Sequence, residues 1–218
     1  LPLYWFDRSL ARTSQQMMWR GIGEALDGER GALEDYVSSS PANARGGVEV
    51  SHEFQLPDYY TAYDIHVMPG SFYGDPLAGL MYDIGAKLYA MGYTHAGYDS
   101  GKKPVADAVP DLEPTRILDL GCGIGGSTMP LADRFPGAEI YGIDLAEPML
   151  RAAHHLFEEN GKRAIFVQGD AAETGFADGF FDVVTATILF HEVPVELGRQ
   201  IVREAYRIVR PGGGFVVG

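Results

Sequence analysis

The chain has 218 residues, 46 % of them hydrophobic and 22 % charged, a composition typical of a folded protein with one sizeable α/β domain and an accessory segment. Its formal net charge of −13 repels polyanions, which disfavours nucleic acids and anionic membrane surfaces as partners. The single cysteine, Cys122, allows no intramolecular disulfide, and no stretch approaches about 18 uninterrupted apolar residues or resembles an export signal. We therefore expect a cytoplasmic protein without a membrane span.

The first half of the chain is expected to form helices and aromatic-rich loops. Its pattern predicts two helical pieces over 10–37, broken near Gly21 and Gly23, and a further helix over 76–92 that opens with a proline and closes on a glycine. Between them, the stretch SSSPANARGG at 38–47 is typical of a mobile loop.

The composition of the chain changes near residue 110. Most of the tyrosines and both tryptophans lie in residues 1–110, which we expect to form a mainly helical cap. Residues 99–115 are punctuated by prolines and charges and are predicted to connect this cap to a second domain over 111–218.

Strands and helices alternate from residue 116 onward. Apolar runs predict strands over 116–120, 138–144, 164–170, 180–190 and 213–218. Helical spacing and capping residues predict helices over 127–135, 147–160 and 195–210. This alternation is typical of a doubly wound, Rossmann-like parallel sheet, the α/β fold class. His154 and His155 fall in the middle of a predicted helix and are expected at the surface.

A glycine-rich turn follows the first of these strands, in RILDLGCGIGGST. Gly121, Gly123 and Gly126 satisfy the pattern G-x-G-x-x-G of nucleotide-binding turns, although a tight turn without a ligand would show it too. Asp144 ends the next strand, where a carboxylate can accept hydrogen bonds from both hydroxyls of a ribose; its alternative role is to cap the following helix.

A second carboxylate stands at the same edge of the predicted sheet. Asp170 ends the third strand, in QGDAAE, where an acceptor suits the exocyclic amine of an adenine. The backbone amide of Ala171 can serve a ring nitrogen of the same base. The two carboxylates therefore predict an adenine nucleoside at this edge.

The motifs LDLGCGIGG, Asp144, GDA, FDVVTATILFHEVP and YRIVRPGGG occur in this order within residues 112–218. Together they resemble the class I S-adenosylmethionine-dependent methyltransferases, and among these the small-molecule branch of ubiquinone and menaquinone biosynthesis. The resemblance implies a Rossmann-like fold, S-adenosylmethionine as methyl donor with S-adenosylhomocysteine as product, and a small organic acceptor, aromatic or from secondary metabolism.

The resemblance also implies roles for individual residues around the cofactor. Asp119 and the backbone of Gly121, Gly123 and Gly125 would face its methionine moiety, and Cys122 would only pack. Asp144 would hold the ribose, and Leu145 and Met149 would flank the adenine. Asp170 and Ala171 would bind the edge of the adenine, and Thr187 and Ile188 would lie beside the sulfonium. An N-terminal tyrosine often reaches the cofactor in related enzymes, and Tyr63 is the candidate in this chain.

The acceptor is expected between the FHEVP motif and the aromatic cap. His191 is the candidate general base, with Glu192 as an orienting neighbour; alternatively, His191 only lines the pocket. The predicted acceptor-binding residues are Tyr59, Tyr60, His66, Phe72 and Tyr73. No spacing of His, Cys, Asp and Glu resembles a metal site, so no metal is expected.

One departure from the family pattern and two other functions stay open. Such enzymes usually continue past the fifth strand, whereas this chain stops at Gly218. We expect truncation or disorder of the following segment; the alternative is a neighbouring chain that completes the sheet, as in a homodimer. A relative that binds the cofactor without transferring methyl is one alternative. A NAD-dependent oxidoreductase is the other, and the RPGGG element argues against it. Whether O, N, C or S accepts the methyl group is not specified by these residues.

Overall fold

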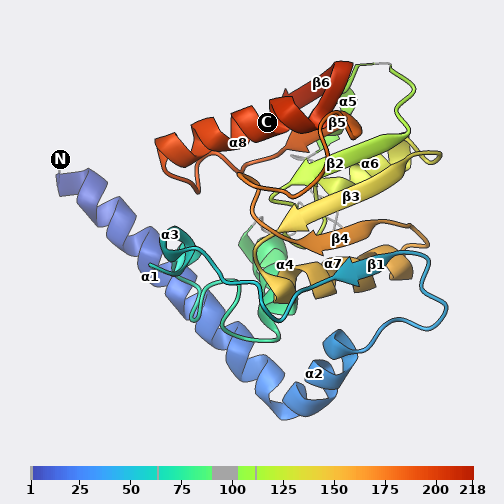
Figure 1. Cartoon of the computed structure of the whole chain (residues 1–218). Coiled ribbons are helices and arrows are strands. Elements are labelled where there is room, and N and C mark those ends of the chain that lie inside the picture. The colour runs from blue at the N-terminus through green and yellow to red at the C-terminus, as the bar shows by residue number, and fades with distance from the viewer. Residues whose placement is uncertain (1, 63, 90–102, 111) are drawn as a thin grey trace.

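The structure is a computed structural model that describes residues 2–62, 64–89, 103–110 and 112–218 (Figure 1). Helices run over α1 Pro2–Leu26, α2 Arg30–Ser38, α3 Asp58–Thr61, α4 Ala78–Tyr89, α5 Lys103–Ala108, α6 Thr128–Arg134, α7 Glu147–Glu159 and α8 Val195–Ile208. Short 3₁₀ turns are η1 Asp27–Glu29 and η2 Ile65–Val67. The strands are β1 Gly47–Glu49, β2 Arg116–Leu120, β3 Glu139–Asp144, β4 Ile165–Gln168, β5 Phe181–Ala186 and β6 Val209–Val217.

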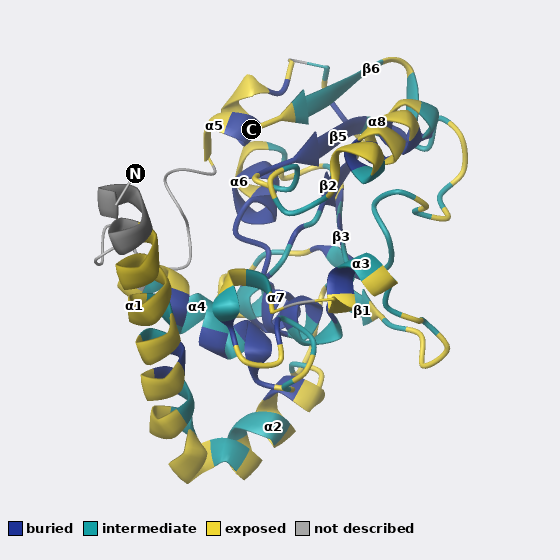
Figure 2. Cartoon of the chain, turned by 90° about the vertical axis from the view of Figure 1, so that its left-hand side faces the viewer, coloured by how far each residue is buried: buried dark blue, intermediate teal, exposed yellow. Residues whose placement is uncertain are grey.

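The strands form one sheet in the order β1-β4-β3-β2-β5-β6, and every neighbouring pair is parallel. Strands β2 and β5 are interior strands, and nearly all of their residues are buried, as their apolar runs predict (Figure 2). The predicted doubly wound α/β fold with an N-terminal helical region is therefore confirmed. Among the described residues, none of the helices has the length and apolar character needed to cross a membrane.

Helices cover both faces of the sheet. One core lies under α5, α6 and α7 and includes Ala106, Ile117, Leu150, Phe157 and Phe166. The opposite core lies under α8 and includes Leu118, Ile143, Val184, Ile201 and Ile208. The N-terminal helices add a further layer, because α4 packs on α7 and α1 packs on α4. The cap therefore stands against the α7 side of the sheet.

The break predicted near Gly21 and Gly23 is wrong. Helix α1 continues through both glycines, and η1 separates it from α2. Trp19 and Ile22 are buried against α4 in this stretch. That packing outweighs the roughly 1 kcal/mol that a glycine costs inside a helix.

Strand β1 was not indicated by the sequence pattern, and Gly47 lies in the stretch predicted to be a mobile loop. The structure ties this stretch to the domain: the backbone N–H groups of Arg45 and Gly46 each donate to Glu158 Oε1 at 2.8 Å, and that of Gly47 donates to the Ala164 carbonyl at 3.1 Å. Three residues are too few to show a strand period, so only the partner strand defines β1.

The predicted connection over 99–115 contains a helix in its described part. Helix α5 buries Val105 and Ala106 against the sheet domain. Both β1 and α5 therefore pack with the sheet although they belong to residues 1–110, and the division of the chain at residue 110 stays a prediction.

The surface position predicted for His154 and His155 is wrong. Both side chains are 5 % exposed, because α4 and α2 cover the outer side of α7. The His155 Nε2 atom lies 3.0 Å from the Ser39 carbonyl oxygen, and its ring stacks at a tilt on Tyr36. Burial lowers the pKa of His154. A helix pattern alone gave no sign of this second layer.

Candidate functional site

A cavity of about 420 Å³ opens where the central strands end, between the sheet and the N-terminal segment. Ligands of open α/β sheets bind at this edge, because the loops that follow parallel strands converge there. The predicted site residues that line the cavity are Tyr59, Tyr60, His66, Phe72, Gly121, Gly123, Asp144, Leu145, Met149, Asp170, Ala171, Thr187, Ile188, His191 and Glu192. The structure therefore brings most of the predicted set together.

Three predicted residues do not line this cavity. These are Asp119, Gly125 and Tyr73, while Tyr63 lies outside the described residues. Tyr73 instead packs its ring 5.6 Å from that of Tyr60, behind the cavity wall.

Asp119 stands beneath the glycine turn and supports it. Its carboxylate is 0 % exposed and accepts hydrogen bonds from the hydroxyls of Ser127 at 2.6 Å, Thr128 at 2.8 Å and Thr185 at 2.8 Å. Ser127 is the N-cap residue of α6, but its hydroxyl donates to Asp119 and makes no hydrogen bond to the helix. These bonds join the end of β2 to α6 and β5, so Asp119 shapes the turn from inside.

The glycine turn runs from Gly121 to Gly126. Gly125 adopts φ +81°, and a Cβ atom there would lie 2.8 Å from the Phe157 ring, so the position requires glycine. Cys122 is 3 % exposed, and its N–H donates to the Ile143 carbonyl at 3.1 Å. The packing role predicted for the cysteine agrees with this burial.

Asp144 both organises the turn and faces the cavity. Its two carboxylate oxygens accept from the N–H groups of Gly123 at 2.9 Å and Ala146 at 3.0 Å. Burial raises the pKa of Asp144, and the two N–H groups act in the opposite direction. Each carboxylate oxygen can accept a second hydrogen bond, so the capping role and the ligand role are compatible.

Asp170 stands beside Asp144 at the end of β4. Its Oδ1 accepts from the Ala172 N–H at 2.8 Å, and its Oδ2 lies 3.3 Å from the Tyr59 hydroxyl, which donates to it. Burial and the negative charge of Asp170 raise the pKa of Tyr59, so this tyrosine stays protonated at neutral pH. A residue of the N-terminal segment thus closes over the predicted adenine position.

Two hydroxyl groups on the cavity wall have no hydrogen-bond partner among the described residues. They belong to Tyr60 and Thr187, whose side chains are 9 % and 7 % exposed. A buried hydroxyl without a partner is costly, so a ligand that supplies one is favoured. Tyr60 packs with Ile124, Ala146 and Met149, between the glycine turn and α7. Together with the carboxylates of Asp144 and Asp170, these hydroxyls suit a polar nucleoside such as that of S-adenosylmethionine.

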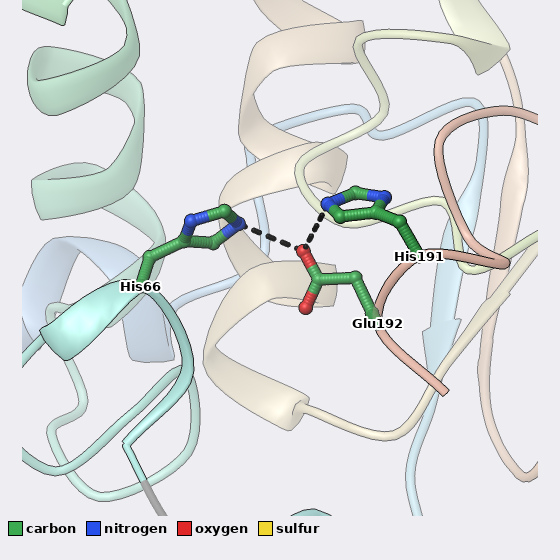
Figure 3. A group of neighbouring side chains, drawn as sticks. All are labelled: His66, His191 and Glu192. Carbon is green, nitrogen blue, oxygen red and sulfur yellow. Dashed lines mark hydrogen bonds and ion pairs between the residues drawn. The ribbon is translucent and has the colours of Figure 1, made fainter. Parts of the chain in front are cut away.

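Glu192 also lines the cavity, and it lies between two histidines (Figure 3). Its Oε1 atom is 2.7 Å from His66 Nε2 and 3.3 Å from His191 Nε2. The hydrogen bond to Glu192 raises the pKa of His66, against the opposite effect of burial. His66 has φ +51° in η2, and its carbonyl accepts from the Trp19 Nε1–H at 3.0 Å.

Sequence reasoning missed the part of the wall that α1 and α4 contribute. Met18 and Trp19 come from α1, and Tyr82, Asp83 and Lys87 come from α4. Lys87 Nζ and Asp83 Oδ2 form an ion pair at 2.5 Å. The only hint in the sequence was the concentration of aromatic residues in the first half, which does not say which of them turn inward.

Comparisons with known proteins point to one family. Residues 117–213 match the family model described as methyltransferase domain. The chain is 37 % identical over 116 residues to a demethylmenaquinone methyltransferase of Thermus thermophilus, covering 53 % of this chain and 52 % of the relative. It is 40 % identical over 120 residues to the nocamycin O-methyltransferase of Saccharothrix syringae, covering 51 % and 41 %. The chain thus spans about half the length of these curated relatives or less.

Solved structures show the same likeness. A phosphoethanolamine N-methyltransferase of Haemonchus contortus, in complex with phosphomonomethylethanolamine and S-adenosylhomocysteine, is 26 % identical with a TM-score of 0.53, covering 66 % of this chain and 34 % of that one. The [4+2]-cyclase SpnF is 28 % identical with a TM-score of 0.50, covering 65 % and 58 %. Residues 117–213 of this chain therefore form a class I, S-adenosylmethionine-dependent methyltransferase domain.

Proposed function

We propose that this protein transfers a methyl group from S-adenosylmethionine to a small organic acceptor. The observation that carries the proposal is a single cavity that reaches from the glycine turn and Asp144 to the histidines beside Glu192. When bound, S-adenosylmethionine supplies a methyl group already activated on a sulfonium sulfur. The protein then has to hold the acceptor in line with that group and exclude water.

The cofactor half of the cavity is assigned to the strand ends. Asp144 would hold the ribose, Leu145 and Met149 would flank the adenine, and Asp170 with the Ala171 N–H would bind its edge. The unpaired hydroxyls of Tyr60 and Thr187 add two polar contacts. Tyr60 was predicted to bind the acceptor, but we assign it to the cofactor, because its ring packs beside Ala146 and Met149. The role of Tyr63 stays a prediction.

The acceptor half is assigned to the cap. Trp19, Phe72 and Tyr82 make an apolar wall that suits a flat organic molecule. His191 is placed as the group that accepts a proton when the acceptor must lose one, and Glu192, 3.3 Å away, orients its ring. The names of the relatives, an O-methyltransferase among them, support a small-molecule acceptor. A homodimer and a cytoplasmic location stay predictions.

The test is a calorimetric titration of the protein with S-adenosylhomocysteine. We expect micromolar binding, which corresponds to about −8 kcal/mol. Asp144→Ala should lose most of it, whereas Asp107→Ala, which removes an exposed carboxylate paired with Lys103, should keep it. Binding of NADH in place of S-adenosylhomocysteine would refute the proposal.

A second candidate is a relative that binds the cofactor but does not methylate. The likeness to SpnF supports this candidate, because that protein is named a [4+2]-cyclase and not a methyltransferase. The two are separated by offering S-adenosylmethionine together with a panel of quinols, phenols and amines. Acceptor-dependent release of S-adenosylhomocysteine identifies the transferase, and tight cofactor binding without any release favours the second candidate.

A further inference from the structure

Three side chains at the acceptor end of the cavity each offer one metal-binding atom. They are His66, His191 and Glu192, and their ligand atoms all lie within 4.8 Å of one another (Figure 3). His66 and Glu192 are 126 positions apart in the chain. Spacing along the sequence could not reveal this group, because only the fold brings its members together.

The distances suit a shared ion. Ligand atoms about 2.0–2.2 Å from one ion lie roughly 3.3–3.6 Å from each other in a tetrahedral site and about 2.8–3.1 Å in an octahedral one. Glu192 Oε1 is 2.7 Å from His66 Nε2 and 3.3 Å from His191 Nε2. The three side chains are partly exposed, so rotations about their side-chain bonds can adjust these spacings to an ion.

The donor set indicates the kind of ion. Two imidazoles and one carboxylate suit divalent transition metals such as zinc, cobalt and iron better than magnesium or calcium, which prefer oxygen ligands. Three protein ligands leave further coordination positions open, as in catalytic sites. Asp144 and Asp170 line the same cavity and make it favourable for a cation.

The backbone that carries these ligands is held in uncommon conformations. His66 and Val67 have φ +51° and +52°, and Ile188, just before the second ligand segment, has φ +57°. Left-handed backbone in a β-branched residue is strained and concentrates at ligand clamps and active sites. The hydrogen bond from Trp19 to the His66 carbonyl helps to hold that segment in place.

We propose that His66, His191 and Glu192 form a binding site for a divalent transition-metal cation, whose open positions take an oxygen atom of the acceptor. The inference rests on the proposed function only for the acceptor, since cation binding needs no methyl transfer. With a cation bound, His191 is a ligand, and the cation replaces it as the group that activates the acceptor.

The experiment uses the untagged full chain, stripped with a chelator and dialysed. Zinc is titrated by calorimetry, and cobalt by its visible absorption, which reports nitrogen and oxygen coordination. We expect one ion per chain. His66→Ala, His191→Ala and Glu192→Gln should each weaken binding by more than the about 10–100-fold that loss of an outer partner of a metal ligand costs. His52→Ala is the matched control, because His52 is exposed and lies outside the cavity lining, and it should bind normally.

Thermal unfolding of each variant confirms that it is folded before its affinity is compared. An alanine variant that is not folded is replaced by the glutamine variant at the same position, His66→Gln or His191→Gln. The proposal is overturned if neither metal binds at stoichiometric concentration, or if the ion binds equally well to all three variants. Titration of the same samples with S-adenosylhomocysteine separates the two proposals. Nucleoside binding without metal binding removes only the cation site, and metal binding without nucleoside binding removes only the transferase.

Discussion

Replacing Gly125 with alanine tests whether the glycine turn is confined by the helix behind it. The residue has φ +81°, and a Cβ atom would lie 2.8 Å from Phe157 Cε2. Phe157 cannot easily yield, because its side chain is 0 % exposed and its ring packs edge-on at 5.0 Å against Phe166. The substitution therefore combines backbone strain with overpacking.

The two effects have separate magnitudes. Left-handed backbone costs a residue with a Cβ about 1–2 kcal/mol, and an extra carbon in a tight core costs about 1–3 kcal/mol. We expect Gly125→Ala to lower the free energy of unfolding by about 2–5 kcal/mol. Gly161→Ala is the matched control, since Gly161 has φ +64° and no atom lies within 4 Å of its added Cβ. Gly161→Ala should lower the free energy of unfolding only by the about 1–2 kcal/mol that left-handed backbone costs.

The assay is equilibrium unfolding in urea, monitored by circular dichroism. The free energies of unfolding of the two variants are compared with the same m-value, the slope of that free energy against urea concentration. Alanine also restricts the unfolded chain, but that effect is common to both variants and cancels in the difference. Equal losses at the two positions would refute the reasoning, because Phe157 would then offer no resistance to the added carbon.

Two further outcomes concern buried polar groups. Burial lowers the pKa of His154, so this side chain binds a proton less readily in the folded protein than in the unfolded chain. The protein therefore has its full stability at pH values above the unfolded pKa of about 6.5, and its stability decreases as the pH falls below that value. His154→Leu should therefore reduce the drop in melting temperature between pH 7 and pH 5, and an unchanged drop would exclude His154 as its source. Asp119→Ala removes the acceptor of three buried hydroxyls and should cost about 3 kcal/mol or more in urea unfolding. A loss below about 1 kcal/mol would show that those hydroxyls find other partners.

The sheet domain could be predicted from the sequence because its signals are local. Buried parallel strands are continuous apolar runs; Asp144 is the last residue of one of them, and Asp170 comes two residues after another. The strand ends of a parallel sheet meet at one edge, so the position of both residues on the cavity wall follows from their place in the chain.

The cap could not be predicted in the same way, because its structure depends on contacts between distant segments. Trp19 turns toward the cavity only because α1 packs on α4, and His154 is buried only because a further layer covers α7. The meeting of His66 with Glu192 likewise depends on how the N-terminal segment crosses the sheet edge. Asp119 shows a different limit: its position was clear, but the direction of its carboxylate depends on three hydroxyls that no motif includes.

The position of β1 also bears on how the chain reaches its native state. Gly47–Glu49 pair in parallel register with Ile165–Val167, so β1 can join the sheet only after a segment more than a hundred residues further along the chain has formed. Contacts of such long range form slowly, because a large loop must close before they stabilise anything. During synthesis α2, α4 and β1 leave the ribosome before the elements they pack on, which are α7 for the two helices and β4 for the strand. We therefore expect the sheet around β2 and β3 to nucleate folding, and the segment that carries His66 to join it in a late step.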